Sequence, residues 1–220
     1  MKILAVSDEE LPALWDYYVP GRLKEYDLIL SCGDLKADYL SFLVTMARAP
    51  LLYVHGNHDE QYRTRPPEGC DCIDGRLVSY NGLRILGLGG CRWYHPGEHQ
   101  YSEKQMQRRI AKLRLALWRS GGVDIVVTHA PPRGVGDADD PAHIGFAALL
   151  PLLDAYHPLY LVHGHVHLRY GVQTPRVRTY VDTQVVNASG RYVLEIPDRP
   201  FPERQRGKLI WKNGVPDLAK

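Results

Sequence analysis

The feature that most constrains the fold is a series of six short apolar runs, each too short to span a membrane. They lie at residues 3–6, 28–30, 51–54, 85–88, 125–127 and 160–162. Runs of this length and of Val, Ile and Leu character are typical of strands that are buried on both faces. Further strands are predicted at residues 76–80, 180–187 and 191–196.

Helical patterns lie between several of these runs. In residues 37–48 apolar side chains recur at helical spacing, and Pro50 ends the pattern. Ser102 and Gln105 form a predicted capping box at the start of a second helix, which ends at the Gly121-Gly122 pair. A third helix is predicted at residues 146–156. Strands that alternate with helices indicate an α/β fold, and we expect residues 1–220 to form a single domain.

Composition and charge narrow the class of protein. A chain of 220 residues with 45% hydrophobic residues can bury a substantial core. A net charge of +2 is too small to indicate a nucleic-acid or membrane partner by electrostatics alone. The four cysteines lack a C-x-x-C pair and are expected to be reduced thiols. Because no signal-like or membrane-spanning run is found, a cytoplasmic protein is expected. The basic residues of the tail are predicted to be solvated surface; they are Arg199, Arg204, Arg206 and Lys208.

Clusters of metal-ligand residue types follow five of the six apolar runs directly. They are residues 7–10 (Ser-Asp-Glu-Glu), 33–34 (Gly-Asp), 56–59 (Gly-Asn-His-Asp), 128–131 (Thr-His-Ala-Pro) and 163–167 (His-Gly-His-Val-His). In an open α/β sheet, ligands bind beyond the carboxyl ends of the strands. The sequence therefore predicts a catalytic metal site at that edge.

In this order the clusters resemble the signature of the calcineurin-like metallophosphoesterase superfamily, which reads D-x-H, G-D, G-N-H-D, H and G-H-x-H. The resemblance covers residues 8–167. It implies a four-layer α/β/β/α sandwich and a phosphoesterase that uses two divalent ions. In this family pattern Asp34 bridges the two ions. One ion takes Asp8, the residue at position 10 and His167, and the other takes Asn57, His129 and His165.

Two further roles follow from the resemblance and from the chemistry of the residues. His58 matches the general acid that protonates the leaving group, and Asp59 is predicted to orient its ring. Two residues apart on an extended segment face the same side, so His165 and His167 are expected to point together, as are Asp8 and position 10. The ion pair would activate water and stabilise charge on the phosphate.

Glu10 departs from the pattern because it stands where the family usually has histidine. A carboxylate ligand makes a harder site, which shifts the preference toward Mn²⁺, Mg²⁺ or iron and away from Zn²⁺. Mn²⁺ is the expected ion, with Fe, Mg²⁺ or Zn²⁺ as alternatives. The other interpretation is an exposed acid beside a weakly occupied site.

The substrate is predicted to be a small phosphate ester. Residues 129–134 and 143–146 resemble the branch of the superfamily that acts on cyclic nucleotides and other small phosphodiesters. Arg133 and His143 are candidate phosphate contacts, with His143 expected at the start of the third helix, and Asn57 is a third candidate. Aromatic side chains in residues 92–99 either stack a base or pack beneath their loop.

Three other functions compete with this interpretation. A nuclease needs an extended basic surface, which the dispersed Lys and Arg residues do not provide. A catalytically weak module that binds metal or nucleotide is supported only by Glu10. A β-lactamase-like metallohydrolase would carry its His-x-His early in the chain, whereas His165 and His167 come late.

Overall fold

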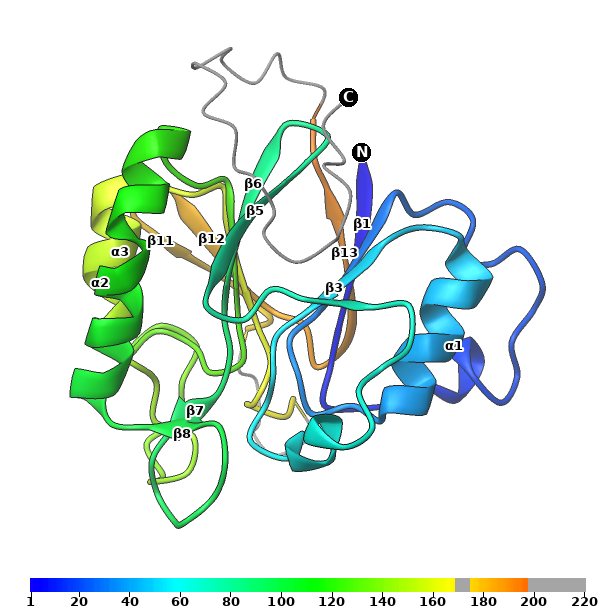
Figure 1. The fold of residues 1–220 in the computed structure, drawn as a ribbon, viewed down its shortest axis with the longest axis horizontal. Helices are drawn as coiled ribbons and strands as arrows, with labels where there is room; N and C mark the ends of the chain where they lie inside the picture. The colour runs from blue at the N-terminus through cyan, green and yellow to red at the C-terminus, as the bar shows by residue number, and fades with distance from the viewer. Residues whose placement is uncertain (169–174, 198–220) are drawn as a thin grey trace.

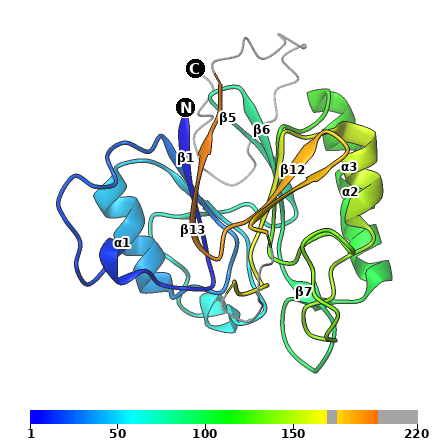
Figure 2. The same cartoon turned by 180° about the vertical axis from the view of Figure 1, so that it is seen from behind.

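Two stacked β-sheets form the centre of the molecule. The computed structural model describes residues 1–168 and 175–197, and the predicted surface charges after Pro197 lie outside this part. The first sheet has the order β13-β1-β2-β3-β4. Its strands are β1 (Lys2–Ser7), β2 (Leu28–Ser31), β3 (Leu51–Tyr53), β4 (Asp71–Cys72) and β13 (Gly190–Glu195). Figure 2 shows β13 beside β1, to which it is antiparallel.

The second sheet has the order β11-β12-β10-β9-β6-β5. Its strands are β5 (Arg76–Tyr80), β6 (Leu83–Leu88), β9 (Ile125–Thr128), β10 (Tyr160–His163), β11 (Val177–Tyr180) and β12 (Thr183–Asn187). A short parallel pair, β7 (Cys91–Arg92) and β8 (Gln100–Tyr101), follows β6. All six runs first predicted as strands lie in these sheets, and they pair in parallel as β1-β2-β3 and β6-β9-β10.

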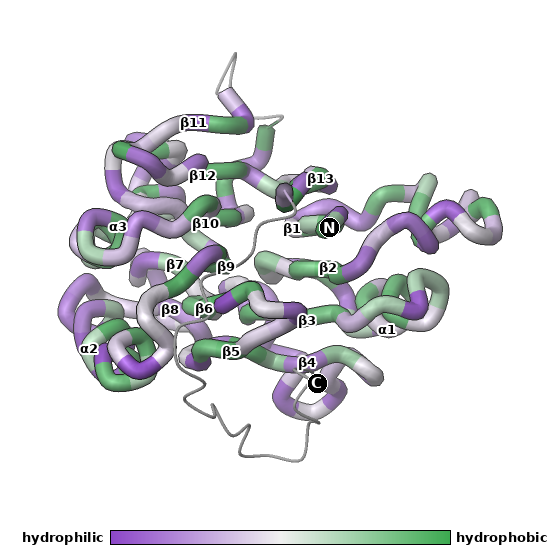
Figure 3. The backbone as a smooth tube through the Cα atoms, turned by 90° about the horizontal axis from the view of Figure 1, so that it is seen from above, coloured by the Kyte–Doolittle hydropathy of each residue, from purple (hydrophilic) through white to green (hydrophobic). Residues whose placement is uncertain are grey.

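Helices cover the outer face of each sheet. Helix α1 (Ala37–Ala47) lies on one side of the molecule, and α2 (Glu103–Ser120) and α3 (Leu149–Tyr156) lie on the other (Figures 1 and 3). Two short 3-10 helices, η1 (Pro12–Leu14) and η2 (Glu60–Arg63), lie in loops. The predicted capping box of Ser102 and Gln105 is present at the start of α2. This arrangement confirms the predicted α/β/β/α sandwich.

Three apolar clusters fill the spaces between the four layers. One lies between the sheets and includes Ile3, Leu30 and Val127. A second joins α2 and α3 to their sheet, and a third joins α1 to its sheet. Because the central strands contribute side chains to a cluster on either face, they read as continuous apolar runs in the sequence. Among the described residues, no helix combines the length and apolarity that crossing a bilayer requires.

Two predicted boundaries were wrong. The strand predicted at residues 180–187 begins too early: Tyr180 is the last residue of β11, the chain turns at Val181, which adopts a left-handed conformation (φ 51°), and β12 begins only at Thr183. The third helix begins at Leu149, three residues after the predicted start. His143 consequently lies in a turn and is not at the beginning of that helix.

Candidate metal centre

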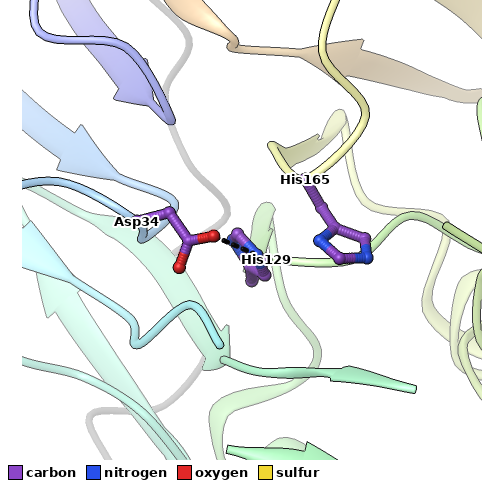
Figure 4. A group of neighbouring side chains, drawn as sticks. All are labelled: Asp34, His129 and His165. Atoms are coloured by element: carbon purple, nitrogen blue, oxygen red, sulfur yellow. Dashed lines mark ion pairs between the residues drawn. The ribbon is translucent and has the colours of Figure 1, made fainter. Parts of the chain in front are cut away.

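The predicted ligand clusters meet at one edge of the molecule. They follow β1, β2, β3, β9 and β10, and the carboxyl ends of parallel strands lie at the same edge of a sheet. Because the two sheets are stacked, residues 7–10, 33–34 and 56–59 from the first sheet face residues 128–131 and 163–167 from the second. Figure 4 shows three of the resulting side chains, Asp34, His129 and His165.

His129 is fully buried and has a distinct partner on each ring nitrogen. Its Nδ1 lies 2.8 Å from the carbonyl oxygen of Cys32, which can only accept a hydrogen bond, so Nδ1 carries a proton. Its Nε2 lies 3.0 Å from Asn57 Oδ1 and 3.3 Å from Asp34 Oδ2. Nε2 of the neutral ring, the amide oxygen and the carboxylate oxygen are all lone-pair donors. A cation can bind where these three atoms converge.

The charges around His129 also favour a cation beside its Nε2 atom. Burial by itself lowers the pKa of His129, but the carboxylates of Asp34 and Asp8 outweigh it and raise the pKa to about 9. Burial likewise opposes ionisation of Asp34, yet His129 and the backbone N–H of His58 hold the pKa of Asp34 well below its usual range. The Asp34 carboxylate is therefore ionised at neutral pH. A proton occupies the position beside Nε2 in the metal-free protein, and a metal ion would replace it.

His165 contributes a neutral ring near the same cation position beside His129 Nε2. Burial lowers the pKa of His165 to about 3. Its Nε2 lies 2.7 Å from the carbonyl oxygen of Ala142, so Nε2 carries the proton and Nδ1 is left with a lone pair. One ligand atom from each of Asp34, His129 and His165 lies within 4.8 Å of the others. We call these three residues together with Asn57 the site group.

Asp8 and His167 lie beside the site group. The backbone N–H of His165 donates to Asp8 Oδ1 at 2.9 Å, which ties β1 to the loop after β10. Burial raises the pKa of Asp8, and the nearby His129 and His167 rings lower it in part. Both predicted ligands are thus brought to the same edge as the site group.

Three of these residues have backbones that non-glycine residues rarely adopt. The φ angles of Asp8, Asp34 and His165 are 64°, 58° and 67°. Each left-handed residue costs about 1–2 kcal/mol, and such conformations cluster at functional sites because the surrounding structure maintains them.

The left-handed residues Asp8 and His165 also correct one prediction. Because residues 8–10 and 165–167 are not extended, the rule that side chains two residues apart point to the same side does not apply to them.

Two glycines allow the loops to approach one another closely. A Cβ added to Gly56 would lie 2.0 Å from Asp34 Oδ1, and a Cβ added to Gly164 would lie 1.9 Å from Ser7 Oγ. These distances are far shorter than a van der Waals contact, so no larger residue fits at either position. The glycines of the G-N-H-D and G-H-x-H clusters therefore serve close contact between neighbouring loops of the site.

The Asp59 side chain binds the backbone of the loops that carry Gly56 and Asp34, whereas the sequence predicted the His58 ring as its partner. Its Oδ2 accepts hydrogen bonds from the backbone N–H groups of Gly56 at 2.7 Å and Asp34 at 3.0 Å. It is 2% exposed. The exposed His58 is attached to the site through its own backbone, since its N–H donates to Asp34 Oδ1 at 2.8 Å. Asp59 therefore orders the backbone around Asp34, and these contacts give no support to its predicted role of orienting the His58 ring.

The Glu10 carboxylate is paired with Lys36. It accepts from the Lys36 backbone N–H at 3.2 Å and lies 3.0 Å from Lys36 Nζ. Lys36 precedes the first residue of α1, where negative charge is stabilising. These contacts favour a capping role, and ligation of metal by Glu10 stays a prediction.

Replacing Glu10 by Gln tests this assignment. The amide still accepts a hydrogen bond but loses the ion pair and the charge at the helix start. We expect an unchanged metal content and a loss of about 0.5–1 kcal/mol in unfolding free energy, the size of a partly exposed pair. Metal analysis and urea denaturation measure the two quantities. A clear drop in bound metal at unchanged stability would instead make Glu10 a ligand.

Of the candidate phosphate contacts His143 and Arg133, only His143 lies next to the site group. The His143 ring centroid is 5.0 Å from that of His165, and its Nδ1 lies 2.8 Å from Asp140 Oδ1. His143 is thus next to the site group. Arg133 is about half exposed, and its Nε lies 3.8 Å from Asp137 Oδ2. Among the described residues, Arg133 makes no hydrogen bond or ion pair with the site group.

Two contacts at the site were not foreseen from the sequence. Asn57 Nδ2 donates to the hydroxyl of Tyr94 at 3.3 Å, and the Ala142 carbonyl accepts from His165. The aromatic residues at 92–99 indicated that this loop matters but did not single out Tyr94. A backbone carbonyl such as that of Ala142 leaves no signal in a sequence.

A second cluster of titratable residues, His55, Asp74 and His99, lies near the first. The His55 and His99 rings are stacked 4.3 Å apart with planes 7° from parallel, so their in-plane lone pairs do not converge on one point. Asp74 is instead an ion-pair centre between His55 and Arg109. This network connects β3, α2 and the β7–β8 loop, and we assign it a structural role.

The ligand atoms at the site group fit a divalent transition-metal ion. Two imidazole nitrogens, a carboxylate oxygen and an amide oxygen are ligands that Mn²⁺, Fe²⁺ and Zn²⁺ accept. Asp34 has a second oxygen, and Asp8 and His167 lie beside it, so the surroundings also contain ligands for a second ion.

Comparisons with known proteins show which proteins the chain resembles. Residues 1–169 match the family described as calcineurin-like phosphoesterase. The UPF0046 protein C25E10.12 of Caenorhabditis elegans is 28% identical, with 93% of this chain and 84% of that protein aligned. The UPF0046 protein K07C11.7 of the same organism is 23% identical, with 91% of this chain and 74% of that protein aligned.

A solved structure shares the fold. The crystal structure of TT1561 of Thermus thermophilus is similar to this chain with a TM-score of 0.59 and 18% identity. The similarity covers 86% of this chain and 89% of that one. At this level of identity the match concerns the fold alone.

Proposed function

The chain belongs to the calcineurin-like phosphoesterase family and is a metal-dependent phosphoesterase, and from this premise we propose that it hydrolyses small phosphodiesters, such as cyclic nucleotides, with two divalent ions. The observation that carries the proposal is the convergence of Asn57 Oδ1 and Asp34 Oδ2 on His129 Nε2. Asn57, His129 and His165 would hold one ion and Asp8 and His167 the other, with Asp34 between them. Mn²⁺ is the preferred ion.

Bound ions of this kind lower the pKa of water to make a nucleophile at neutral pH and neutralise charge on the phosphate. The protein keeps the ligands in place. Cys32 and Ala142 fix the proton positions of His129 and His165 through their carbonyl oxygens, so that an unprotonated nitrogen faces the ion. Asp59 fixes the backbone around Asp34.

We assign protonation of the leaving oxygen to His58. Its ring is exposed, so an incoming substrate can reach it, while its backbone N–H is anchored to Asp34. His143, held by Asp140 and next to His165, is placed to donate a hydrogen bond to a phosphate oxygen.

The His58→Ala variant tests the acid role. Alanine retains the backbone N–H that contacts Asp34, so metal content should be unchanged. Turnover should fall about 100-fold or more for an alkyl or cyclic nucleotide ester, whose leaving group needs a proton. For a nitrophenyl ester the loss should be much smaller, because nitrophenolate leaves unaided.

Rates on both esters, measured at saturating Mn²⁺, give the comparison. His157→Ala, at an exposed position after α3 where the ring pairs with Asp182, is the matched control for loss of an imidazole. Equal losses on the two esters would contradict the acid role, and wild-type protein that cleaves only long nucleic acid would contradict the proposed substrate class.

A further inference from the structure

The amide of Asn57 can occupy its space in two ways that differ by a half-turn. The two ends are similar in shape, but only the oxygen carries a lone pair that a metal ion accepts. In the structure Oδ1 faces His129 Nε2 at 3.0 Å, on the side of the site group. Asn57 is 4% exposed, so water does little to satisfy either end.

The nitrogen end of this amide has a single side-chain partner among the described residues. Asn57 Nδ2 donates to the hydroxyl oxygen of Tyr94 at 3.3 Å. Without that acceptor, turning the oxygen toward the ion would leave a buried N–H without a partner, which is unfavourable. The hydroxyl of Tyr94 thus favours the orientation that metal binding requires.

Tyr94 is itself fixed by its surroundings. Its ring packs against the apolar cluster beneath α2 and α3. Its backbone N–H donates to Gln100 Oε1 at 3.3 Å, across the loop that β7 and β8 close. The hydroxyl is therefore held at a defined position relative to Asn57.

We infer that Tyr94 is a positioning residue that orients the Asn57 amide so that its oxygen faces the metal ion. Tyr94 belongs to none of the ligand clusters and acts only through Asn57. The inference rests on the proposed function in one respect, namely that Asn57 is a metal ligand.

A double-mutant cycle on Tyr94 and Asn57 provides the test, with Mn²⁺ alone as the probe. Tyr94→Phe should weaken Mn²⁺ binding about 10- to 100-fold, the usual effect of removing a group that orients a ligand. Asn57→Asp presents an oxygen whichever way the carboxylate is turned. In that background the change from Tyr94 to Phe should alter Mn²⁺ affinity less than about twofold.

Calorimetric titration of the four proteins measures the affinities, and thermal melts in a chelator confirm that each is folded. Tyr101→Phe is the matched control, because Tyr101 lies in β8 of the same small sheet and packs beneath Arg109. It should leave Mn²⁺ affinity unchanged.

The possible outcomes are distinct. An equal loss in both backgrounds would show a general structural effect and overturn the inference, as would no loss in Tyr94→Phe. A loss in Tyr101→Phe as large as that in Tyr94→Phe would overturn it too. Wild-type protein that binds no Mn²⁺ would overturn the proposed function as well, whereas tight wild-type binding that Tyr94→Phe leaves unchanged would overturn the inference alone.

Discussion

Replacing Asp34 by Asn is expected to remove most bound metal and to lower turnover at least a thousandfold, which corresponds to about 4 kcal/mol of transition-state stabilisation. The substitution preserves shape but removes a charge that the site holds ionised. His129 and the His58 backbone lower the pKa of Asp34 despite its burial, so the carboxylate carries its full charge at neutral pH. Asn retains one oxygen, which is a much weaker ligand than a carboxylate between two cations.

Metal content and the shift of the melting temperature on adding Mn²⁺ measure this effect independently of turnover. An ion that binds the folded state raises its stability by mass action, so wild-type protein should melt at a higher temperature with Mn²⁺ than in a chelator. Asp34→Asn should lose that difference. Asp16→Asn, at an exposed position, should keep it. An Asp34→Asn variant with normal metal content and activity would exclude the proposed centre.

Replacing Gly164 by Ala is expected to have the second largest effect. The added Cβ would lie 1.9 Å from Ser7 Oγ and 2.7 Å from Asp8 Oδ2. The Ser7 side chain cannot rotate away without losing a hydrogen bond, because its hydroxyl donates to the Gly33 carbonyl at 3.0 Å. The loop after β10 must therefore move away from β1, and the hydrogen bond from His165 to Asp8 is broken.

We expect a loss of about 2–4 kcal/mol in unfolding free energy, the upper range for overpacking in a buried place. Mn²⁺ affinity should fall together with activity. Denaturant melts in a chelator separate the stability loss from the metal effect. Gly75→Ala is the control, because a Cβ there meets no atom within 4 Å and only the positive φ of 69° is unfavourable. Near-normal stability and metal binding in Gly164→Ala would show that the two sheets can separate locally without cost.

The strands and the helices were predictable from the sequence, and the sequence also named the four residues that the structure brings together as the site group. Apolar runs such as residues 125–127 are continuous because their strands are buried on both faces, and helical spacing in residues 37–48 reflects one buried face. Both patterns extend over only a few consecutive residues, so they can be recognised in the sequence alone. One boundary error arose where a single left-handed residue, Val181, divides a continuous pattern.

The sequence by itself determined the α/β class, the order of the ligand clusters and the identities of Asp34, Asn57, His129 and His165. Tertiary structure alone decided which neighbours these residues meet. It placed Glu10 on Lys36, gave Asp59 backbone partners, and brought Tyr94 to Asn57. The physical reason is that loop side chains take their direction from single backbone angles, such as the left-handed φ of Asp8, and from contacts between segments far apart in the chain. Neither leaves a periodic trace in the sequence.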